Sequence, residues 1–559
     1  MGHWLLRTAY RFVFSREILL SAIIVGVGLR ISSAFLISVG FDANHYLVMG
    51  ESFSRTGEFL VPWGDPGSPG LVPSFSHHMS PLWPMILGAT FALFGYSIGL
   101  AKAVSFFTSL FVLPVTYTAT RDLYGNSTAL ATTTVIALLP ELILDVGRVY
   151  SENLTMIFFV LTIWAILKSL RDRRFMLLGG LFAGLVYLSR ASAGYFFLVA
   201  GLAGLAWRFR YMRFGVFRDR SYLGAIGIFG GIVLAWSLRN VARFGFPHWE
   251  TDAYLSSYTI QAFANPAGYG QMLLLTVILF IVFLVSLGAF FGPEIVKSLR
   301  LIRREEESGL WLGIVLVPLV AAFIAAVFAT FEIGGQSVLS IDRIRYVIYA
   351  FFPLLLVGLR RIEIRSLLER GPEGDSQKDL RLRLKKPTSL QMAATLICAV
   401  SLAFSALAFL LWLIPLLVLG LLAVYVADSK TRLLLLVAAL LLVSVEVGTS
   451  STITAEGQSV QFILGLDVRA VVAFEGGSDL YYNLSVYVIQ TSLELTDFMN
   501  SSRAEFVISS SSGLVISGMS PVATFYDRAS QGVVQTTLFS LIGRSTTDLS
   551  SPVTVYQRA

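Results

Sequence analysis

The run ILLSAIIVGVGLRISSAFLISV, residues 18–39, decides the fold class of this chain. A bilayer core about 30 Å thick requires about 20 apolar residues in a helix, and this run is long enough to cross it. Comparable apolar stretches follow at residues 98–120, 127–147, 152–169, 175–190, 192–207, 222–238, 271–291, 309–331, 344–359, 390–412, 414–427 and 433–449. The sequence therefore predicts a polytopic α-helical membrane protein with about 13 transmembrane helices.

The composition supports the same class. The chain has 559 residues, of which 55% are hydrophobic and 14% are charged, and its mean hydropathy is +0.73. Soluble domains contain about 25% charged residues, so a soluble enzyme of two or three domains, a disordered chain and a fibrous repeat are excluded. The single cysteine, Cys398, excludes a disulfide framework and a cysteine-based metal site.

Basic residues in the loops predict the orientation, because lysine and arginine concentrate on the cytosolic side of a membrane protein. With the N-terminus in the cytosol, 28 of the 42 lysines and arginines fall in cytosolic segments, and the long outer loop 40–80 holds only Arg55. We therefore expect an integral multi-pass protein, in the cell membrane if the source is a prokaryote. The net charge of +7 then reflects topology and attraction to membrane lipids, and we expect no nucleic-acid partner.

A change in composition after Gly448 predicts two domains. Residues 1–449 form the transmembrane part, and residues 450–559 contain no apolar run of membrane-spanning length. The patterns at 470–474 and 505–509 indicate strands, and 487–501 has the spacing of a helix. We expect residues 450–559 to form a small α/β domain on the extracytosolic side.

The first outer loop contains a candidate catalytic carboxylate, Asp42, in the stretch Gly40-Phe-Asp-Ala-Asn-His-Tyr46. A carboxylate at the mouth of a membrane cavity can act as a general base. Asp42 could instead cap a loop or a short helix, since aspartate is a preferred capping residue. Position alone leaves both roles open.

The histidines do not predict a metal site. His77 and His78 are adjacent and so seldom face one ion, and no spaced pair of carboxylates accompanies them or His45. A bound divalent cation is possible but is not supported by the spacing of these residues. The sequence indicates no other cofactor. No Walker loop, GxSxG or HExxH motif occurs, so nucleotide hydrolysis, serine hydrolysis and zinc proteolysis have no basis in the sequence.

Several arginines fall at the outer ends of predicted spans, where the topology predicts few basic residues. Arginine beside a lipid-facing run usually lines a cavity or pairs with an anion, and its planar fork suits phosphate. Interfacial snorkelling and pairing with Asp145, Glu152 or Asp342 are the alternatives. We expect at least two of these arginines to face a phosphate; they are Arg148, Arg190, Arg239, Arg243, Arg343 and Arg345.

The order of several short motifs resembles a known group. They are the first-loop Asp42, His77-His-Met-Ser-Pro-Leu-Trp-Pro84, Phe94-Gly-Tyr-Ser97, Leu123-Tyr-Gly125, Leu139-Pro140, Arg148, Ser151-Glu152, Ser189-Arg190, Arg239-Asn240 and Arg345-Tyr346. Together they resemble the membrane glycosyltransferases of the GT-C superfamily, in particular the branch of the protein O-mannosyltransferases and the lipid A aminoarabinose transferase. The resemblance covers about residues 18–360.

This resemblance implies an inverting transfer of one sugar from a polyprenyl-phosphate donor, such as a dolichyl phosphate, to a lipid, glycan or protein on the outer face. It implies that Asp42 is the base and that Glu152 is a second acidic site residue. It assigns the donor phosphate to Arg345 and Tyr346, with Arg148, Arg190, Arg239 and His78 as further candidates. Ala43 follows Asp42 where protein mannosyltransferases usually have glutamate, which disfavours that particular activity.

Two other functions remain open at the level of the residues. A transporter or flippase for an anionic lipid or solute would also place arginines around a cavity, and broken helices in two symmetric halves would favour it. A scaffold or sensor with an extracytosolic domain would not depend on Asp42. No internal repeat is visible in the sequence.

Overall fold

The computed structural model divides the chain into two compact units, which are described separately. The first unit comprises residues 1–29, 109–143 and 152–445, and the second comprises 30–108, 144–151 and 446–559. The structure describes residues 16–37, 39, 41–62, 71–73, 80–191, 193–194, 197, 201, 219–244, 352–353, 355–356, 359, 418–420, 422–423, 429–449, 451–453, 471–475, 487–490, 506–509, 519–526, 528–530 and 552–558.

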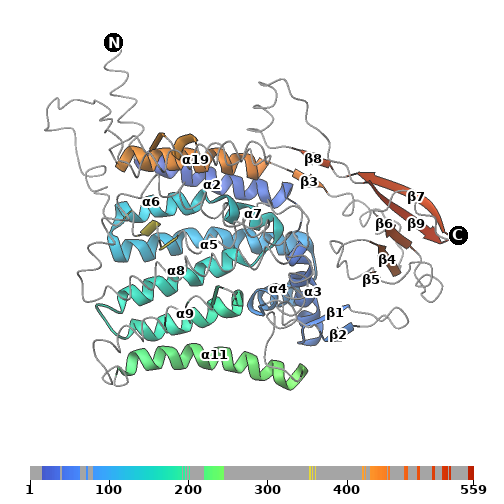
Figure 1. The fold of residues 1–559 in the computed structure, drawn as a ribbon, viewed down its shortest axis with the longest axis horizontal. Coiled ribbons are helices and arrows are strands. Elements are labelled where there is room, and N and C mark those ends of the chain that lie inside the picture. Colours follow the sequence, from blue (N-terminus) through green and yellow to red (C-terminus); the bar gives the residue numbers. More distant parts are fainter. Residues whose placement is uncertain are drawn as a thin grey trace, which may run out of the picture. The chain divides into compact units, whose positions relative to one another are not determined.

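Apolar sequences of membrane-spanning length form the long helices (Figure 1). Within the described residues three helices are long and apolar enough to cross a membrane, at Glu17–Leu36, Ile98–Tyr124 and Arg220–Ala242. They belong to α2 (Arg16–Leu36), α5 (Ile98–Tyr124) and α11 (Arg220–Phe244). The chain is therefore a polytopic helical membrane protein, as the sequence predicts.

Three further predicted spans also correspond to helices. These are α8 (Glu152–Lys168), α9 (Phe175–Ser189) and α19 (Ser429–Thr449). The predicted spans at 271–291, 309–331 and 390–412 lie outside the described residues, and only a few residues of 192–207, 344–359 and 414–427 lie inside them. The total of 13 spans stays a prediction.

The predicted span 127–147 is a broken helix, not a continuous one. It consists of α6 (Asn126–Ala137) and α7 (Pro140–Arg148), which meet at an angle of 50°. Pro140 has no backbone N–H to donate, and proline disfavours helical geometry in the residue before it. The helix therefore stops before Leu139 and restarts at the proline.

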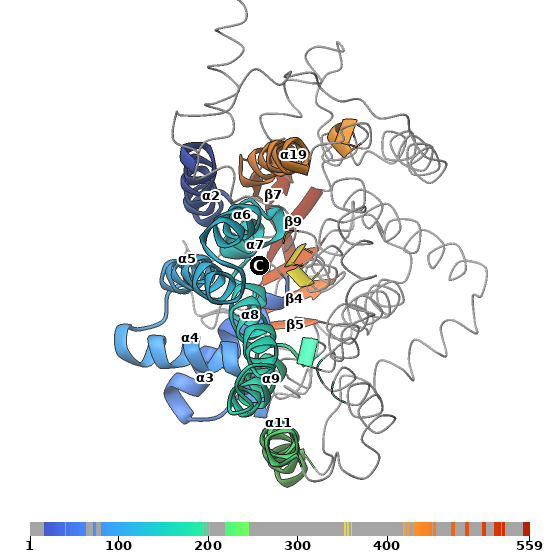
Figure 2. The ribbon, with the colours of Figure 1, turned by 90° about the vertical axis from the view of Figure 1, so that its left-hand side faces the viewer.

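Helices α8, α9 and α11 of the first unit pack side by side (Figure 2). On α9, Gly180 and Gly184 face α11: a Cβ atom on Gly180 would lie 2.7 Å from the Ala225 Cα, and one on Gly184 would overlap the side chain of Ile232. Small residues four positions apart allow two membrane helices to approach closely. This spacing brings α9 against α11 along its length.

The second unit contains a helical pair near the first outer loop. Helix α3 (Phe41–Thr56) packs on α4 (Leu82–Phe94), with short antiparallel strands β1 (Leu60–Pro62) and β2 (Leu71–Pro73) between them in sequence. A Cβ on Gly88 would lie 2.6 Å from the Gly50 carbonyl oxygen, so the two helices touch through their backbones. Helix α4 is not among the predicted elements, because its apolar run is too short to cross a bilayer.

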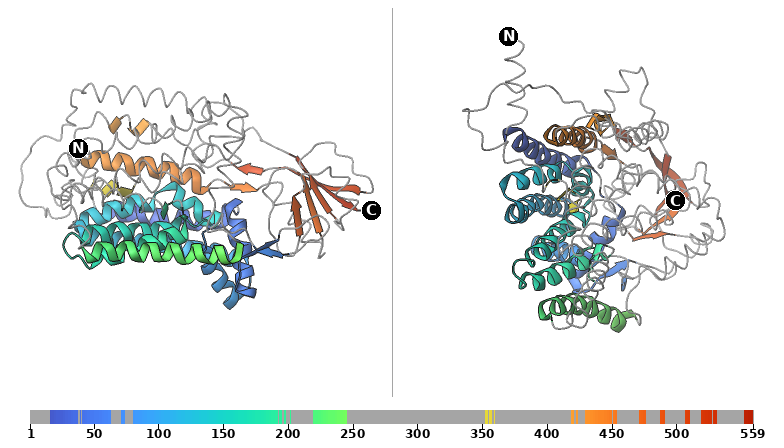
Figure 3. Two further views of the ribbon diagram at one scale, coloured as in Figure 1. Left: turned by 60° about the horizontal axis from the view of Figure 1, so that its bottom comes forward. Right: turned by 60° about the vertical axis from the view of Figure 1, so that its left-hand side comes forward.

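Strands near the C-terminus form one five-stranded and one two-stranded sheet (Figure 3). The larger sheet has the order β5-β4-β6-β9-β7, with β4 parallel to β5 and β6, and β9 antiparallel to β6 and β7. The smaller sheet pairs β3 with β8. The strand bounds are β3 (Ser451–Ile453), β4 (Val471–Glu475), β5 (Tyr487–Gln490), β6 (Phe506–Ser509), β7 (Met519–Tyr526), β8 (Arg528–Ser530) and β9 (Pro552–Arg558).

The strands predicted at 470–474 and 505–509 are confirmed as β4 and β6. The helical interpretation of 487–501 is wrong for its first residues, because Tyr487–Gln490 form β5. This segment, YVIQ, is rich in aromatic and β-branched side chains, and pairing with β4 fixes it as a strand. The boundary at 450 and the extracytosolic location of this domain stay predictions.

Candidate functional site

A buried ion pair joins the ends of α8 and α9 in the first unit. Glu152 is the first residue of α8, and Arg190 is the residue that follows the end of α9. Arg190 Nη1 donates to Glu152 Oε1. The Glu152 side chain is 1% exposed and that of Arg190 is 11% exposed, so water does not screen the pair. The sequence predicted both residues as site residues, and the structure brings them together.

The two helix ends favour these charges. An α-helix carries partial positive charge at its N-terminus and partial negative charge at its C-terminus. Glu152 lies at the positive end of α8, and Arg190 lies at the negative end of α9. Each residue is thus stabilised by its own helix as well as by its partner. Pairing with Glu152, which the sequence offered as an alternative role, is confirmed for Arg190.

The pair retains bonding capacity. Glu152 Oε2 is buried and accepts no hydrogen bond from the described residues. An ionised carboxylate can accept hydrogen bonds at both oxygens, and a buried acceptor without a donor costs free energy. The described residues therefore leave one acceptor of the pair unused.

The link between α7 and α8 has an unusual backbone. Val149 has φ = 62°, in the left-handed region, and its side chain is buried. A β-branched residue is rarely found there, and such a conformation costs about 1–3 kcal/mol. Trp83 Nε1 donates to the Val149 carbonyl oxygen at 2.9 Å, and the Tyr46 hydroxyl lies 3.2 Å from Ser151 Oγ. All four residues belong to the second unit.

Arg148, the last residue of α7, precedes this link. Its guanidinium carbon lies 5.9 Å from the centre of the Tyr150 ring, within the range of a cation–π contact. One turn earlier, the fully buried Asp145 accepts a hydrogen bond at its backbone oxygen from Ser105 Oγ, at 3.2 Å. A short helix in the broken span thus ends in a half-buried arginine.

Arg239 lies near the end of α11. Its guanidinium carbon lies 4.8 Å from the Trp236 ring centre, and Nη1 donates to Asn240 Oδ1 at 3.0 Å. These neighbours are on its own helix. Its role toward a phosphate stays a prediction.

Asp42 is the second residue of α3, in the first turn of that helix. Its role as a base or as a cap stays a prediction. His78, Arg345 and Tyr346 lie outside the described residues. Among the residues that the structure describes, no three His, Cys, Asp or Glu side chains form a cluster that could hold a metal ion.

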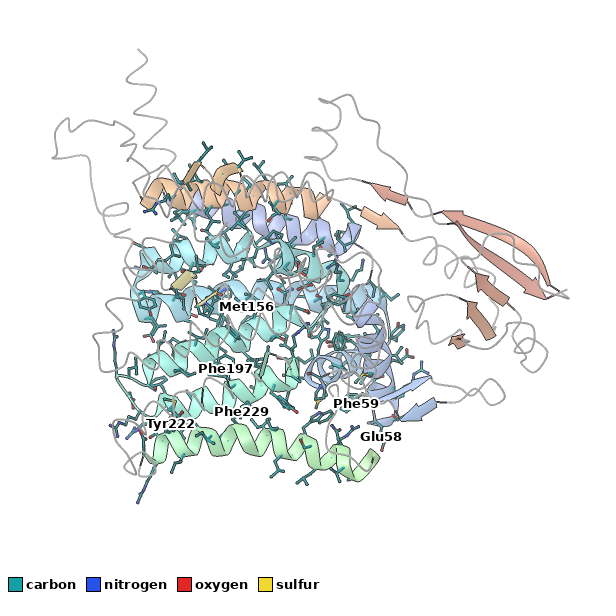
Figure 4. The ribbon with its side chains drawn as sticks, viewed as in Figure 1. Glu58, Phe59, Met156, Phe197, Tyr222 and Phe229 are labelled. Carbon is teal, nitrogen blue, oxygen red and sulfur yellow. The ribbon has the colours of Figure 1, made fainter. Side chains whose placement is uncertain are left out.

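A buried carboxylate on α3, Glu51, is not among the predicted site residues. Glu51 is 2% exposed and pairs with Arg55. Burial raises the pKa of Glu51, and the nearby Arg55 opposes that rise. Burial and the charge of Glu51 raise the pKa of Tyr96 to about 12. The end of α3 is held by Phe53 stacking on Phe59 at 5.1 Å and by Ser52 Oγ donating to the Glu58 carbonyl, 2.9 Å away (Figure 4).

The C-terminal end of α8 carries a different ion pair, with a residue of α5. Lys168, the last residue of α8, donates to Asp122 Oδ2 at 2.6 Å, and Trp164 Nε1 donates to the same oxygen at 2.8 Å. Lys168 is 29% exposed and Asp122 is 42% exposed. Tyr222 of α11, labelled in Figure 4, belongs to a small buried cluster with Met176 of α9. The predicted topology places this end in the cytosol.

Sequence reasoning missed Trp83, Tyr46 and Val149. Trp83 and Tyr46 lie within motifs that were singled out, but no pattern in the sequence identifies their partners, which are more than 60 residues away. The positive φ of Val149 had no sequence signal, because glycine or asparagine is the usual residue there.

No protein-family profile and no curated protein sequence matches the chain. Among solved structures, it is similar to ArnT from Cupriavidus metallidurans bound to undecaprenyl phosphate, with 14% identity and a TM-score of 0.46 over 96% of this chain and 97% of that chain. It is also similar to AglB, an archaeal oligosaccharyltransferase from Archaeoglobus fulgidus, in complex with an inhibitory peptide and a dolichol-phosphate. That match has 10% identity and a TM-score of 0.42 over 88% of this chain and 69% of that chain.

Proposed function

We propose that this protein is an inverting glycosyltransferase that moves a single sugar from a polyprenyl-phosphate donor to a lipid, glycan or protein acceptor on the outer face of the membrane. The buried Glu152–Arg190 pair is the observation that carries this proposal. Ionisable residues inside a membrane protein are costly, and they are usually functional. The motif order described above supplies the reaction class.

The chemistry follows from the residues. The acceptor hydroxyl or amine attacks the anomeric carbon of the sugar and loses its proton to Asp42, the proposed general base. The bond between the anomeric carbon and the phosphate oxygen breaks, and the lipid phosphate leaves with its electron pair. One displacement from the opposite face inverts the anomeric carbon. The proposal assigns no step to a metal ion.

Cations stabilise the leaving phosphate. Charge develops on the phosphate oxygen in the transition state, and preorganised donors aimed at that oxygen lower the barrier. We assign this role to Arg345 and Tyr346, with Arg148, Arg239 and His78 as further contributors. Arg190, which donates an N–H to Glu152, is a further candidate for this role.

In the predicted topology this site faces away from cytosolic nucleotides. Glu152 and Lys168 are the two ends of α8, about 25 Å apart at 1.5 Å per residue. The Lys168 end carries the basic loop 168–174, which the positive-inside rule assigns to the cytosol. Glu152 then lies at the outer face, where a lipid-linked donor replaces a nucleotide sugar.

The direct test is reconstitution. The purified protein in liposomes receives a polyprenyl-phosphate sugar, and mass spectrometry follows release of the free polyprenyl phosphate and labelling of acceptors extracted from the source cells. Surface glycans and lipids of a deletion strain are compared in parallel. We expect one sugar residue to be missing from one acceptor in that strain. Unchanged glycans and lipids, with no donor turnover in liposomes, would sink the proposal.

A flippase for an anionic lipid is the second candidate. The broken span formed by α6 and α7 favours it, since discontinuous helices line the binding sites of many transporters. The two functions give different products from one experiment. A flippase moves a fluorescent polyprenyl-phosphate lipid between leaflets and leaves its sugar attached, whereas a transferase cleaves the sugar from the phosphate.

A further inference from the structure

The link between α7 and α8 is clamped at two points by side chains from the first outer loop region. Trp83 of α4 donates its indole N–H to the Val149 carbonyl, and the Tyr46 hydroxyl of α3 bonds with Ser151 Oγ. The two bonds bracket residue 150. Trp83, Val149 and Ser151 are fully buried, and Tyr46 is 5% exposed.

We propose that Trp83 and Tyr46 are positioning residues, which hold residues 149–151 in the strained conformation that directs Arg148 toward the donor phosphate. The role toward the phosphate rests on the function proposed above. The clamp itself rests only on contacts within the second unit.

The backbone of Val149 gives the first reason. Its φ of 62° places a β-branched side chain in the left-handed region, where the side chain crowds the backbone. A residue keeps such a conformation only when its surroundings determine it more strongly than its own preference. The Trp83 hydrogen bond ends on this same residue, at 2.9 Å, so it opposes relaxation to negative φ.

The chemistry of the two clamping groups gives the second reason. The indole N–H can only donate, and burial leaves no water to replace its acceptor. If the Val149 carbonyl moved, the fully buried Trp83 would lose its partner. The hydrogen bond between the Tyr46 hydroxyl and Ser151 Oγ adds a second buried contact two residues later. The preferred partners of both side chains therefore fix the path of the chain after Arg148.

The placement of the clamp gives the third reason. Tyr46 lies one turn after Asp42 on α3, and Trp83 closes the motif His77-His-Met-Ser-Pro-Leu-Trp. The same two segments that carry the predicted base and the predicted phosphate ligand His78 thus also carry the two side chains that hold the α7–α8 link. A shift of about 1 Å in a binding group can cost about 100-fold in rate, so such a link needs to be rigid.

Matched substitutions test the proposal. Trp83→Phe removes the buried bond to the Val149 carbonyl, and the control Trp164→Phe removes an exposed indole bond to the Asp122 carboxylate near the other end of α8. Tyr46→Phe is matched by Tyr222→Phe, which removes a buried hydroxyl bond to the Gly201 carbonyl. We expect kcat/KM for a polyprenyl-phosphate sugar to fall about 10- to 100-fold in the two clamp variants and by less than threefold in the two controls.

A readout independent of activity accompanies the kinetics. Hydrogen exchange of the amides of residues 148–152, measured in detergent micelles, should become at least tenfold faster in Trp83→Phe and stay unchanged in Trp164→Phe. Equal exchange in the two variants would overturn the clamp. If the wild-type protein transferred no sugar, the proposed function would fail, while the exchange measurement would still decide whether the clamp exists.

Rescue separates positioning from general stability. Glycine adopts positive φ without steric cost, so Val149→Gly lowers the strain that the clamp resists. Adding Val149→Gly to Trp83→Phe should recover activity by at least threefold. A structural role for Trp83 alone predicts no recovery, because the glycine fills none of the space left by the indole. The proposal would be overturned if Val149→Gly restored no activity and if Trp83→Phe lowered melting temperature and activity in parallel.

Discussion

The two ends of α8 each carry an ion pair, and the pairs differ in one physical respect. At the outer end of the predicted topology, Glu152 and Arg190 are 1% and 11% exposed. At the inner end, Asp122 and Lys168 are 42% and 29% exposed, and Lys168 also lies over the Trp164 and Phe175 rings. The inner pair is reached by water, and the outer pair is not.

This difference indicates which pair has a role beyond stability. An exposed ion pair contributes about 0–1 kcal/mol to the stability of the fold, so its presence indicates little about function. A buried pair loses hydration on folding, and apolar residues of the same size would often be as stable. The outer pair is therefore poorly explained by stability alone. The following experiments test this difference between the buried and the exposed end, from the largest expected effect to the smallest.

The largest effect is expected at Asp42. Asp42→Asn keeps the size of the side chain and removes the proton acceptor, so turnover should fall by about 10²- to 10⁴-fold while donor binding persists. The inner-end control Asp122→Asn should leave turnover within about threefold. Transfer rates in liposomes check both. A near-normal Asp42→Asn enzyme would assign Asp42 to capping, because Asn and Asp cap helices comparably.

The next effect separates the two pairs by stability. Arg190→Ala leaves the Glu152 carboxylate buried without its cation, and we expect a loss of about 3–5 kcal/mol. Lys168→Ala breaks the exposed pair and should cost about 0–1 kcal/mol. Denaturant unfolding in mixed micelles measures both. Equal losses of stability would remove the distinction between the two ends. If adding Glu152→Gln to Arg190→Ala restored the stability, the unpaired charge would be confirmed as the cause of the loss.

A third test extends the comparison to another outer end. Arg345→Ala should weaken binding of a polyprenyl-phosphate sugar by about 30-fold or more, since losing one partner of a desolvated charge pair costs about 2–5 kcal/mol. Arg343→Ala, two residues away, should change binding much less, because only Arg345 occupies the Arg-Tyr motif. Titration of the donor lipid into each variant measures the difference. Equal small effects would remove Arg345 from the site.

The smallest effect concerns the helix contact between the two ends. A Cβ on Gly180 would collide with the backbone of Ala225, whereas no atom of the described residues lies within 4 Å of one on Gly230. Gly180→Ala should destabilise the protein by about 1–3 kcal/mol, and Gly230→Ala should stabilise it by roughly 0.5–1 kcal/mol, because alanine is the better helix former. Thermal unfolding in detergent decides whether the signs differ as expected.

The long helices could be predicted from the sequence because each one is marked by a continuous apolar run. The apolar runs behind α2, α5, α8, α9, α11 and α19 are visible in any window of about 20 residues. The same criterion did not predict the break at Pro140, because α6 and α7 together have the length of one span. It also gave no place to α4, whose 13 residues are apolar but too few to cross a membrane.

The sequence by itself determined the class of the protein, the helices named above and the identity of Glu152 and Arg190 as candidates, because composition, periodicity and motif order are properties of the chain. The tertiary structure alone decided that these two residues bond to each other, that Trp83 and Tyr46 hold the link after α7, and that Val149 is strained. The physical reason is that burial and hydrogen-bond partners depend on contacts between residues far apart in sequence. Local patterns select the residues that can bond, and packing selects the partners.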